Sequence, residues 1–337
     1  MERKRIIKWK VILGVFFLTF VGPVSNTVAK DVYPTQDINY ICYSQPGGSF
    51  DIIARGIAPF LSKHLREVSP GAKGGNIKVK NVTGGSGVKE LEFLFKEADT
   101  EGYSIGDFNR GNFYRFYLSG EKLPFDITKF TWLYSTTQVN RVLISGKKGP
   151  KTWEEMLALS KKEPSRWGVS SVGGSVHLET IYILETTRIP SKITIWGSAS
   201  QAQAAIIRGD ADVSVIELGG LVPLIESKGV NVLVSFTENR VLPQVPTIKE
   251  KGFPLIPRNV GGQGIGITIG PPNLDPEAKR IIVEAAKKTM VDPGFLDFSK
   301  KMGLDINPLY GKEIDDIITE SVKFYKEWAP IYKKYGL

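Results

Sequence analysis

Short apolar runs alternate along this chain with longer segments in which apolar residues recur every three or four positions. The short runs are typical of buried strands, and the longer segments are typical of amphipathic helices. In the segment 50–65, for example, Ile53, Ile57 and Leu61 fall on one face of a helix. Regular alternation of this kind predicts an α/β fold in which mostly parallel sheets are flanked by helices. The predicted strands are 38–43, 77–82, 103–108, 132–135, 141–145, 167–170, 193–195, 213–216 and 232–236.

The alternation breaks after residue 236. A proline-rich passage follows at 242–246, and the glycine-spaced segment 261–269 is interpreted as a close-packed strand. Its glycine spacing fits neither the dinucleotide-binding motif nor the P-loop, so no nucleotide site is indicated. Two further helices are predicted at 276–290 and 312–332.

The turn Pro46-Gly47-Gly48-Ser49 joins the first predicted strand to the first predicted helix. Glycine permits a tight turn, and Ser49 is a candidate helix cap. The start of a helix presents unpaired N–H groups and a partial positive charge, which together favour a carboxylate or a phosphate. A second Gly/Ser turn at 170–175 has the same position between a strand and a helix. Two such turns facing one cleft predict capture of a small anion, with Ser49 and Ser171 on opposite walls.

The N-terminal segment has the pattern of a secretory signal peptide. Basic residues occupy the first ten positions, an apolar core spans 11–22, and the small residues before Lys30 suit cleavage after Ala29. We therefore expect a signal peptide over 1–29 and a periplasmic protein. The alternative is an uncleaved anchor, although the apolar core is shorter than the roughly 20 residues of a membrane span.

The charge distribution and the few cysteine and histidine residues argue against nucleic-acid binding and metal binding. The formal net charge is +9, but the basic residues are scattered, so the sequence lacks the basic stripe with aromatic platforms typical of nucleic-acid binding. A modest positive field favours small anionic ligands. Cys42 is the sole cysteine and lies in an apolar strand, where a buried structural thiol is expected. Apart from Cys42, only His64 and His177 could supply the nitrogen or sulfur ligands that zinc prefers, so we expect neither a zinc site nor a cofactor.

Residues 46–55 read P-G-G-S-F-D-I-I-A-R, which resembles the P-G-G-S-x-D-x-x-A-R signature of the tripartite tricarboxylate transporter substrate-binding proteins, the Bug family. Other segments resemble motifs of that family in the same order, and together they extend over essentially the whole chain after residue 30. These segments are 81–87, 101–103, 167–178, 209–213, 242–252, 292–293 and 302–304.

The resemblance implies a periplasmic binding protein-like fold of type II, with two α/β domains that close on a small carboxylate held in the cleft between them. It implies domain 1 over 30–136 with 255–337, domain 2 over 137–254, and crossovers near 134–140 and 248–260. The ligand would pass to an ion-driven membrane permease of one large and one small subunit. We expect a monomer without catalytic activity that binds no nucleic acid.

The resemblance also implies where the ligand binds. The amides of the first turn would hold one carboxylate, and the second turn would contribute from the other domain. The expected ligand-binding residues are Tyr43, Gln45, Gly47, Gly48, Ser49, Phe50, Asn109, Arg110, Ser170, Ser171, Val172, Gly173, Gly174, Ser175 and Trp196.

The chain departs from the family pattern in loops that would face the ligand. Gln45 and Thr83 replace prolines, and Val88 replaces an asparagine. Trp196 stands where the family often has lysine, and Phe50 stands where threonine is common. The two rings predict a carboxylate with an aromatic or apolar body in preference to citrate. Packing of both rings against the cleft wall is the competing interpretation.

Several candidate residues have ordinary structural explanations. Asp51 lies in the first turn of a helix, where an acidic residue more often supports the helix dipole than it contacts a ligand. Ser175 and His177 suggest a nucleophile and base, but their spacing does not aim both side chains at one point, and we expect His177 to be structural. Glu179 is expected to be solvated.

Two other functions remain compatible with the sequence. A secreted hydrolase or transferase would use the glycine-rich turns for a phosphorylated or otherwise anionic substrate, although no nucleophile, base and metal set is evident. A sensor would present the ligand to a membrane receptor instead of a permease.

Overall fold

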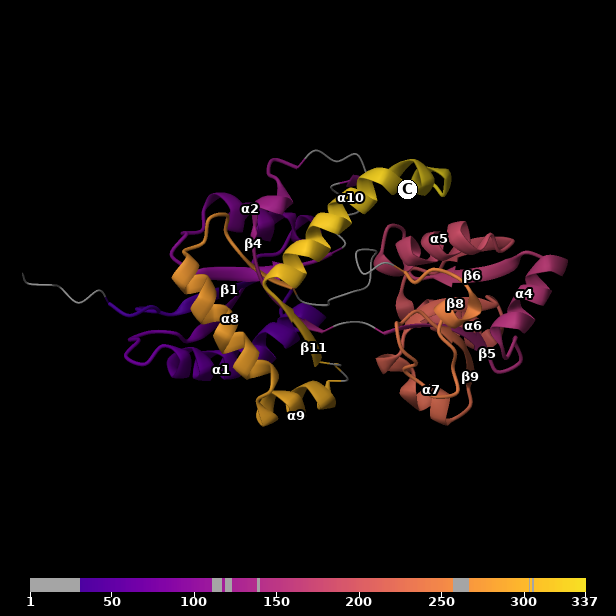
Figure 1. The fold of residues 1–337 in the computed structure, drawn as a ribbon, viewed down its shortest axis with the longest axis horizontal. Coiled ribbons are helices and arrows are strands. Elements are labelled where there is room, and N and C mark those ends of the chain that lie inside the picture. The colour runs from indigo at the N-terminus through magenta and orange to yellow at the C-terminus, as the bar shows by residue number, and fades with distance from the viewer. Residues whose placement is uncertain are drawn as a thin grey trace, which may run out of the picture. The chain divides into compact units, whose positions relative to one another are not determined.

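The strands of the computed structural model form two sheets, and the residues described are 31–110, 117–118, 123–137, 140–256, 267–302, 304 and 306–337 (Figure 1). Residues 32–337 belong to one compact unit. The predicted signal peptide and most of the predicted glycine-spaced strand 261–269 lie outside the described residues.

The first sheet, sheet A, has the strand order β11-β4-β10-β3-β1-β2. Strand β1 is parallel to β2 and β3, whereas β10 is antiparallel to β3 and β4, and β11 is antiparallel to β4. Its strands are β1 (Ile38–Cys42), β2 (Ile77–Asn81), β3 (Ser104–Phe108), β4 (Thr131–Thr137), β10 (Ile267–Gly270) and β11 (Ile306–Tyr310).

The second sheet, sheet B, has the order β7-β6-β8-β5-β9. Strand β6 is parallel to β7 and β8, and β5 is antiparallel to β8 and β9. Its strands are β5 (Arg141–Gly146), β6 (Ser165–Val169), β7 (Ser191–Ile195), β8 (Val213–Glu217) and β9 (Val230–Ser235).

Helices cover both faces of each sheet. The described helices are α1 (Ser49–Val68), α2 (Val88–Lys96), α4 (Trp153–Lys162), α5 (Ser175–Thr187), α6 (Ala199–Arg208), α7 (Val222–Glu226), α8 (Pro276–Met290), α9 (Pro293–Lys301) and α10 (Lys312–Lys334). Successive side chains of a strand point to opposite faces. In β1, therefore, Ile38 and Tyr40 pack in the core under α1, α8 and α9, while Ile41 packs with α2 and α10. In sheet B, α4 and α5 cover one face and α6 covers the other.

Helix α5 is buried on more than one side. Ile183 and Leu184 pack in the core of sheet B, whereas Leu178, Ile181 and Tyr182 join the cluster that contains α10. A helix that is packed on several sides does not have the solvent-exposed polar face of an ordinary surface helix. This position explains why residues 177–184 are all buried.

The predicted α/β class is confirmed, but the sheets are mixed and not mostly parallel as expected. In sheet A, β10 and β11 pair antiparallel with their neighbours, and in sheet B, β5 does. The strands of 38–137 and 267–310 form sheet A, and those of 141–235 form sheet B. The domain boundaries and crossovers stay predictions.

Three elements were not predicted from the sequence, namely α7, α9 and β11. Strand β11 contains Pro308, which cannot donate to a ladder and argues against a central strand. An edge strand tolerates proline, and β11 lies at the edge of sheet A. Helix α9 begins with Asp292 as its cap and Pro293 at its first position, a start signal that the sequence does contain.

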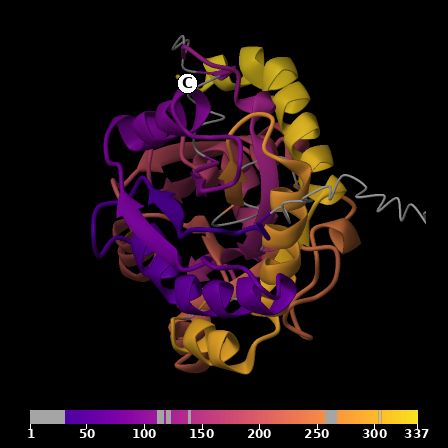
Figure 2. The ribbon, with the colours of Figure 1, turned by 90° about the vertical axis from the view of Figure 1, so that its left-hand side faces the viewer.

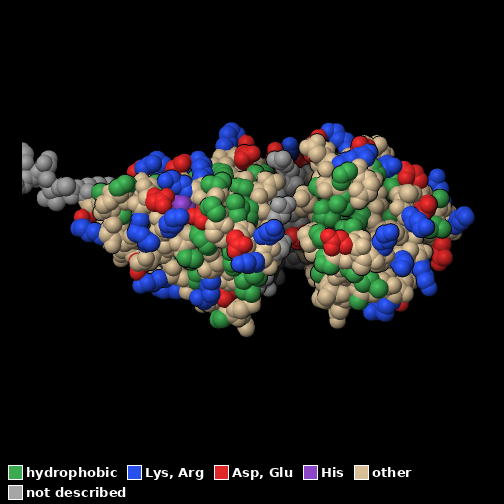
Figure 3. Space-filling view, turned by 90° about the horizontal axis from the view of Figure 1, so that it is seen from below, with side chains coloured by type: hydrophobic (Ala, Val, Ile, Leu, Met, Phe, Trp, Pro, Cys, Tyr) green, Lys and Arg blue, Asp and Glu red, His purple; other side chains and the backbone are tan. Residues whose placement is uncertain are grey.

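Charged side chains of both signs are interspersed on the face that Figure 3 shows. This mixture agrees with the scattered charge of the sequence. Within the ranges that the structure describes, no helix has both the length and the hydropathy needed to cross a membrane.

Candidate functional site

Sheet A has a topological switch point at the carboxyl ends of β1 and β3. Strand β2 follows β1 along the chain and pairs with one side of it, whereas β3 pairs with the other side. In open α/β sheets, ligands bind beyond the carboxyl ends of strands at such a point. The turn 43–48 directly follows β1, and Asn109 and Arg110 directly follow β3. The fold therefore brings the first group of predicted site residues to one edge of sheet A.

Asp51 holds the turn after β1 in place. Its Oδ2 atom accepts the Gly47 N–H at 2.9 Å, and its Oδ1 atom accepts the Asn81 Nδ2 amide at 2.8 Å. The same Asn81 amide donates to the Ser44 carbonyl at 2.8 Å. Gly47 has φ +81°, a left-handed conformation that favours glycine. The expected Ser49 cap is wrong: Ser49 is the first helical residue, and Gly48 occupies the cap position without a side-chain hydrogen bond.

The Asp51 carboxylate is only 2% exposed and is stabilised as an anion. Burial alone would raise its pKa, but hydrogen bonds from Arg55, Asn81 and the Gly47 N–H outweigh that effect and lower the pKa to about 2. The Arg55 Nε atom lies 3.0 Å from both carboxylate oxygens. In this structure Asp51 is engaged in building the turn, which agrees with the structural interpretation of this residue.

A buried carboxyl group separates β1 from β3 at the switch point. The pairing of β1 with β3 ends at Ile41 and Gly106. Beyond it, Glu90 of α2 accepts the Asp107 N–H at 2.8 Å and also the Tyr43 N–H. A Cβ atom on Gly106 would lie 2.6 Å from Glu90 Oε1, so this position requires glycine. The Glu90 carboxyl thus replaces ladder hydrogen bonds where the two strands diverge.

Glu90 and Asp107 form a buried pair of acids that sequence reasoning missed. The Tyr40 hydroxyl donates to Asp107 Oδ1 at 2.7 Å, and the Cys42 thiol also hydrogen-bonds to this carboxyl group. Burial raises the pKa of Asp107 to about 7, and burial together with the Asp107 charge raises the pKa of Glu90 above its usual range. A lone glutamate in a helix gives no sequence signal of burial. Cys42 is buried and free, as expected.

We expect Asp107→Asn to alter how stability depends on pH. Because the folded-state pKa of Asp107 is raised from 3.8 to about 7, its favourable contribution is complete below pH 4 and is lost as the pH rises through 7. The wild-type free energy of unfolding should therefore fall relative to that of the variant, by about 3 kcal/mol between pH 5 and pH 8. Urea unfolding at both pH values measures this difference.

The matched control for that measurement is Asp297→Asn, which changes an exposed carboxylate on α9. Its stability relative to wild type should not change between the two pH values. An equal change for Asp107→Asn and Asp297→Asn would contradict the buried, protonated state of Asp107.

Aromatic and amide side chains gather at the same edge of sheet A. The rings of Tyr43 and Phe50 lie 4.7 Å apart, and the Tyr43 hydroxyl hydrogen-bonds to the Asn109 side chain. Arg110 is buried, and its charge acts on that of Glu179 in α5. Gln45 is exposed. The structure therefore brings together Tyr43, Phe50 and Asn109 beside the turn.

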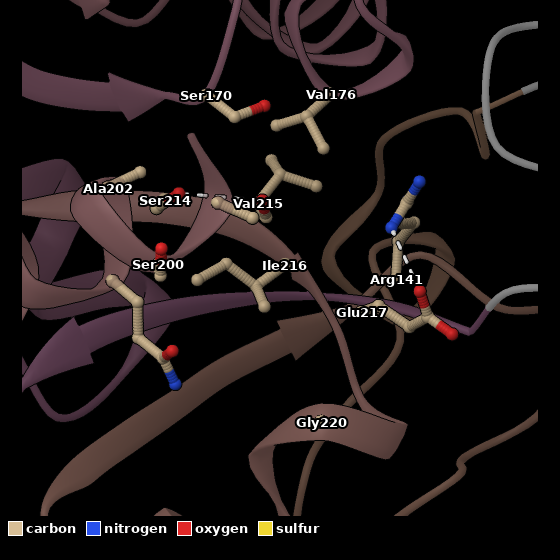
Figure 4. A pocket seen from close by; sticks show the side chains of 12 residues that line it. Arg141, Ser170, Val176, Ser200, Ala202, Ser214, Val215, Ile216, Glu217 and Gly220 are labelled. Carbon is tan, nitrogen blue, oxygen red and sulfur yellow. Dashed lines mark hydrogen bonds and ion pairs between the residues drawn. The ribbon is translucent and has the colours of Figure 1, made fainter. Parts of the chain in front are cut away.

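Sheet B has its own switch point, between β6 and β8. Strand β7 follows β6 along the chain and pairs with one side of it, and β8 pairs with the other side. A pocket of about 290 Å³ lies at this point (Figure 4). It is lined by Arg141, Ser170, Val176, Ala199, Ser200, Ala202, Gln203, Ser214, Val215, Ile216, Glu217 and Gly220. Of the predicted site residues, Ser170 lines this pocket.

The turn 170–175 is shaped by His177. The Gly173 N–H donates to His177 Nδ1 at 3.1 Å, and Gly174 is the cap of α5. Burial lowers the pKa of His177, which keeps the ring neutral and able to accept this bond. A structural role for His177 is therefore supported. Ser171 and Val172 are exposed at the tip of the turn.

Glu179 is not solvated, which corrects the sequence-based expectation. It is 1% exposed, and its Oε2 atom accepts from Arg141 Nε at 2.9 Å. A second Arg141 nitrogen, Nη2, donates to Ser175 Oγ at 3.2 Å. Burial raises the pKa of Glu179, and the guanidinium groups of Arg141 and Arg110 oppose that shift. Sequence reasoning missed Arg141, because its position at the first residue of a strand carries no signal of burial.

Trp196 packs against the hydrophobic cluster under α6. Its indole lies over Gly168, where an added Cβ would be 3.5 Å from Trp196 Nε1. The Trp196 backbone N–H donates to the Val169 carbonyl, which extends the β6–β7 pairing by one residue. Trp196 is not among the residues that line the pocket of sheet B. Stacking of its ring on a ligand stays a prediction.

Among the described residues, no group of three His, Cys, Asp or Glu side chains is placed to hold a metal ion. The arrangement offers backbone N–H groups at two helix starts, an arginine in a pocket and several hydroxyl groups. These groups suit reversible binding of a small anion.

This chain is similar to one known protein family over most of its length. The family model described as "Tripartite tricarboxylate transporter family receptor" matches residues 72–337. A UPF0065 protein encoded in the TAR-I ttuE-ttuC' intergenic region of Agrobacterium vitis is 26% identical over 232 residues, which are 67% of this chain. The aligned region spans 64% of the length of that relative.

Solved structures share the fold. A TctC solute-binding protein from Polaromonas superposes with a TM-score of 0.77 at 18% identity, covering 90% of this chain and 99% of the other. An R. palustris protein solved with adipate gives a TM-score of 0.62 at 20% identity, covering 90% of this chain and 98% of the other.

Proposed function

This chain belongs to the tripartite tricarboxylate transporter receptor family, and we propose that it captures a small carboxylate outside the cytoplasm and delivers it to a membrane permease. The observation that carries this proposal is the pair of switch points, each followed by a Gly/Ser turn at a helix start. Proteins of a receptor family act by binding, so we propose that the chain performs no catalysis.

In this proposal the amides after Pro46 bind one carboxylate of the ligand. The Gly47 and Gly48 N–H groups donate to Asp51 and to the Gln45 carbonyl, so the proposed donors are the N–H groups of Ser49 and Phe50 at the start of α1. Gly47 and Gly48 let the backbone approach closely, and the hydrogen bonds of Asp51 and Asn81 support the required conformation. Hydrogen bonds from N–H groups to a carboxylate are short and strong, and they need no cationic side chain. Tyr43, Gln45, Ser49, Phe50, Asn109 and Arg110 complete the proposed contacts at sheet A.

The proposed contacts at sheet B come from the turn 170–175, with Ser171 on the wall of a cleft opposite Ser49. A ligand that contacts both sheets favours a closed form, because only the closed form makes both sets of contacts. The permease would then recognise the closed form. Removal of the signal peptide 1–29 would place the protein in the periplasm.

Binding of a panel of acids tests this function. The panel contains monocarboxylates, dicarboxylates including adipate, citrate and an aromatic carboxylate, because the rings of Phe50 and Trp196 predict a ligand with an apolar body. A true ligand at 100 times its dissociation constant should stabilise the protein by about 2.7 kcal/mol, seen as a rise in melting temperature. The acid should be recovered chemically unchanged, since conversion to a product would indicate an enzyme.

The variant Gly47→Ala tests whether the first turn is the binding site. Gly47 and Gly252 both have φ +81°, and an added Cβ would meet no atom within 4 Å at either position. Each alanine should cost about 1–2 kcal/mol of stability, because the left-handed conformation is unfavourable for it. Calorimetry with the tightest acid should show binding weakened about tenfold by Gly47→Ala and unchanged by Gly252→Ala. Equal binding by both variants would place the site elsewhere.

A further inference from the structure

The pocket of sheet B has a cationic side chain at one end and apolar walls. In Figure 4, Arg141 and Glu217 lie together on one side, while Ser200 and Ala202 lie on the other. Val215 and Ile216 of β8 lie between these groups. A pocket of about 290 Å³ is near the lower limit of small-molecule sites, so a short chain would fit it.

We infer that Arg141 is the specificity-determining residue of this pocket and binds a second carboxylate of the ligand, while the apolar walls enclose the chain between the two carboxylates. This inference rests on the proposed function, since it assigns the far end of the same ligand. It adds a residue that the family resemblance did not point to.

Arg141 is held in a fixed orientation by its neighbours. Its Nε atom donates to Glu179 at 2.9 Å, and its Nη2 atom donates to Ser175 Oγ at 3.2 Å. The Nη1 atom lies 3.9 Å from Glu217 Oε2, which is too long for a hydrogen bond. Within the described ranges this ion pair is the contact of Nη1, so its hydrogens are available to a ligand, while the bonds to Glu179 and Ser175 prevent the guanidinium from moving away.

The two glutamates beside Arg141 have different roles. Glu179 is buried and keeps the arginine in position, so it is a positioning residue. The Glu217 side chain is 41% exposed and can turn toward solvent when a carboxylate approaches Arg141. The guanidinium of Arg110 also acts on Glu179 and adds positive potential near this end of the pocket.

Helix starts reinforce the preference for an anion. Val176 lies in the first turn of α5, and Ala199 and Ser200 begin α6; all three residues line the pocket. The N-terminal turns of both helices carry partial positive charge. A ligand that ends in a methyl group would offer no carboxylate to the Nη1 hydrogens of Arg141 and would place an apolar group beside them, so the site would bind it more weakly than a dicarboxylate.

The test uses the double variant Arg141→Gln/Glu179→Gln, which removes both members of the ion pair and so leaves the net charge beside Arg110 unchanged. Its folding is verified by circular dichroism. Calorimetry then compares the tightest straight-chain dicarboxylate with the monocarboxylate of equal carbon number. We expect dicarboxylate binding to weaken by about 10- to 150-fold, the range for a charged hydrogen bond, and monocarboxylate binding to change by less than about threefold.

Arg166→Gln is the matched control, because Arg166 is an exposed arginine at the start of β6 that pairs with Asp212. It should leave both affinities unchanged. The inference is overturned if the double variant keeps its dicarboxylate affinity, if it loses both acids equally, or if the wild type binds the monocarboxylate as tightly. A wild type that binds no acid of the panel would instead overturn the proposed function.

Discussion

Replacing Asp51 with alanine should lower the free energy of unfolding by about 2–4 kcal/mol and weaken carboxylate binding at least about tenfold. The Gly47 N–H and the Asn81 amide both donate to this buried carboxylate. Without it, two donors lose their acceptor and the turn that should present its amides to the ligand is no longer fixed. Chemical denaturation and calorimetry with the tightest acid measure the two effects.

Asp297→Ala is the matched control for this variant. Asp297 and Lys301 form an i,i+4 ion pair, as do Asp51 and Arg55, but both members of the former pair are exposed. Exposed pairs of this kind contribute less than about 1 kcal/mol. Equal losses of stability for the two variants would show that the Asp51 network does not hold the turn.

The contribution of Asp51 should also depend on pH in a definite direction. Its folded-state pKa is lowered from 3.8 to about 2, so its stabilising effect is complete above pH 4 and is lost as the pH falls through 2. The stability difference between wild type and Asp51→Asn should therefore be constant at neutral pH and should shrink on acidification.

Phe295→Ala should lower the free energy of unfolding by about 3–5 kcal/mol, because it leaves a cavity in the core of sheet A. Phe295 of α9 is fully buried, and its ring lies 5.8 Å from that of Phe60 in α1. Gly56 of α1 allows α9 to approach closely, since a Cβ at this position would clash with the ring of Phe298 of α9. Helices α1 and α9 are in contact, and Figure 2 shows them at the lower edge of the view.

Leu296→Ala is the control for the cavity. Leu296 is the next residue of the same helix and is 42% exposed, so its truncation should cost less than about 1 kcal/mol. Urea unfolding of the two variants separates core packing from helix propensity. A similar small loss for both would mean that α9 does not contribute to the core.

Local patterns in the sequence predicted most of the regular structure. The alternation of apolar runs and amphipathic segments gave the strands from β1 to β9 and the helices α8 and α10, because periodicity is set by neighbours along the chain. The sequence contains the start signal of α9, Asp292 followed by Pro293, but this two-residue signal precedes a helix of only nine residues. Strand β11 was not predicted because it contains Pro308, and proline is acceptable in a strand only at the edge of a sheet. Which strand lies at the edge is decided by the assembled sheet and not by the local sequence.

The candidate site was predicted in part for the same reason. The Gly/Ser turns at 46–49 and 170–175 follow from glycine and serine chemistry and from their place between a strand and a helix. The cap at Ser49 was wrong, because α1 already begins at Ser49 and Gly48 takes the cap position. The turn is held instead by Asp51, which also accepts from Asn81, thirty residues further along the chain. The sequence also gave no reason to bury Glu90 or Asp107.

By itself, then, the sequence determined the α/β class, the order of most strands and helices, and the two turns that begin α1 and α5. Only the tertiary structure decided that Arg141 meets Glu179, two residues separated by 38 positions. Strand β5 runs antiparallel to β8, so its first residue, Arg141, lies at the carboxyl end of β8. Helix α5 follows β6, which is parallel to β8, so α5 and its Glu179 begin at the same edge of the sheet. A charged side chain is buried when the fold supplies its partner, and partners that are distant along the chain leave no local pattern.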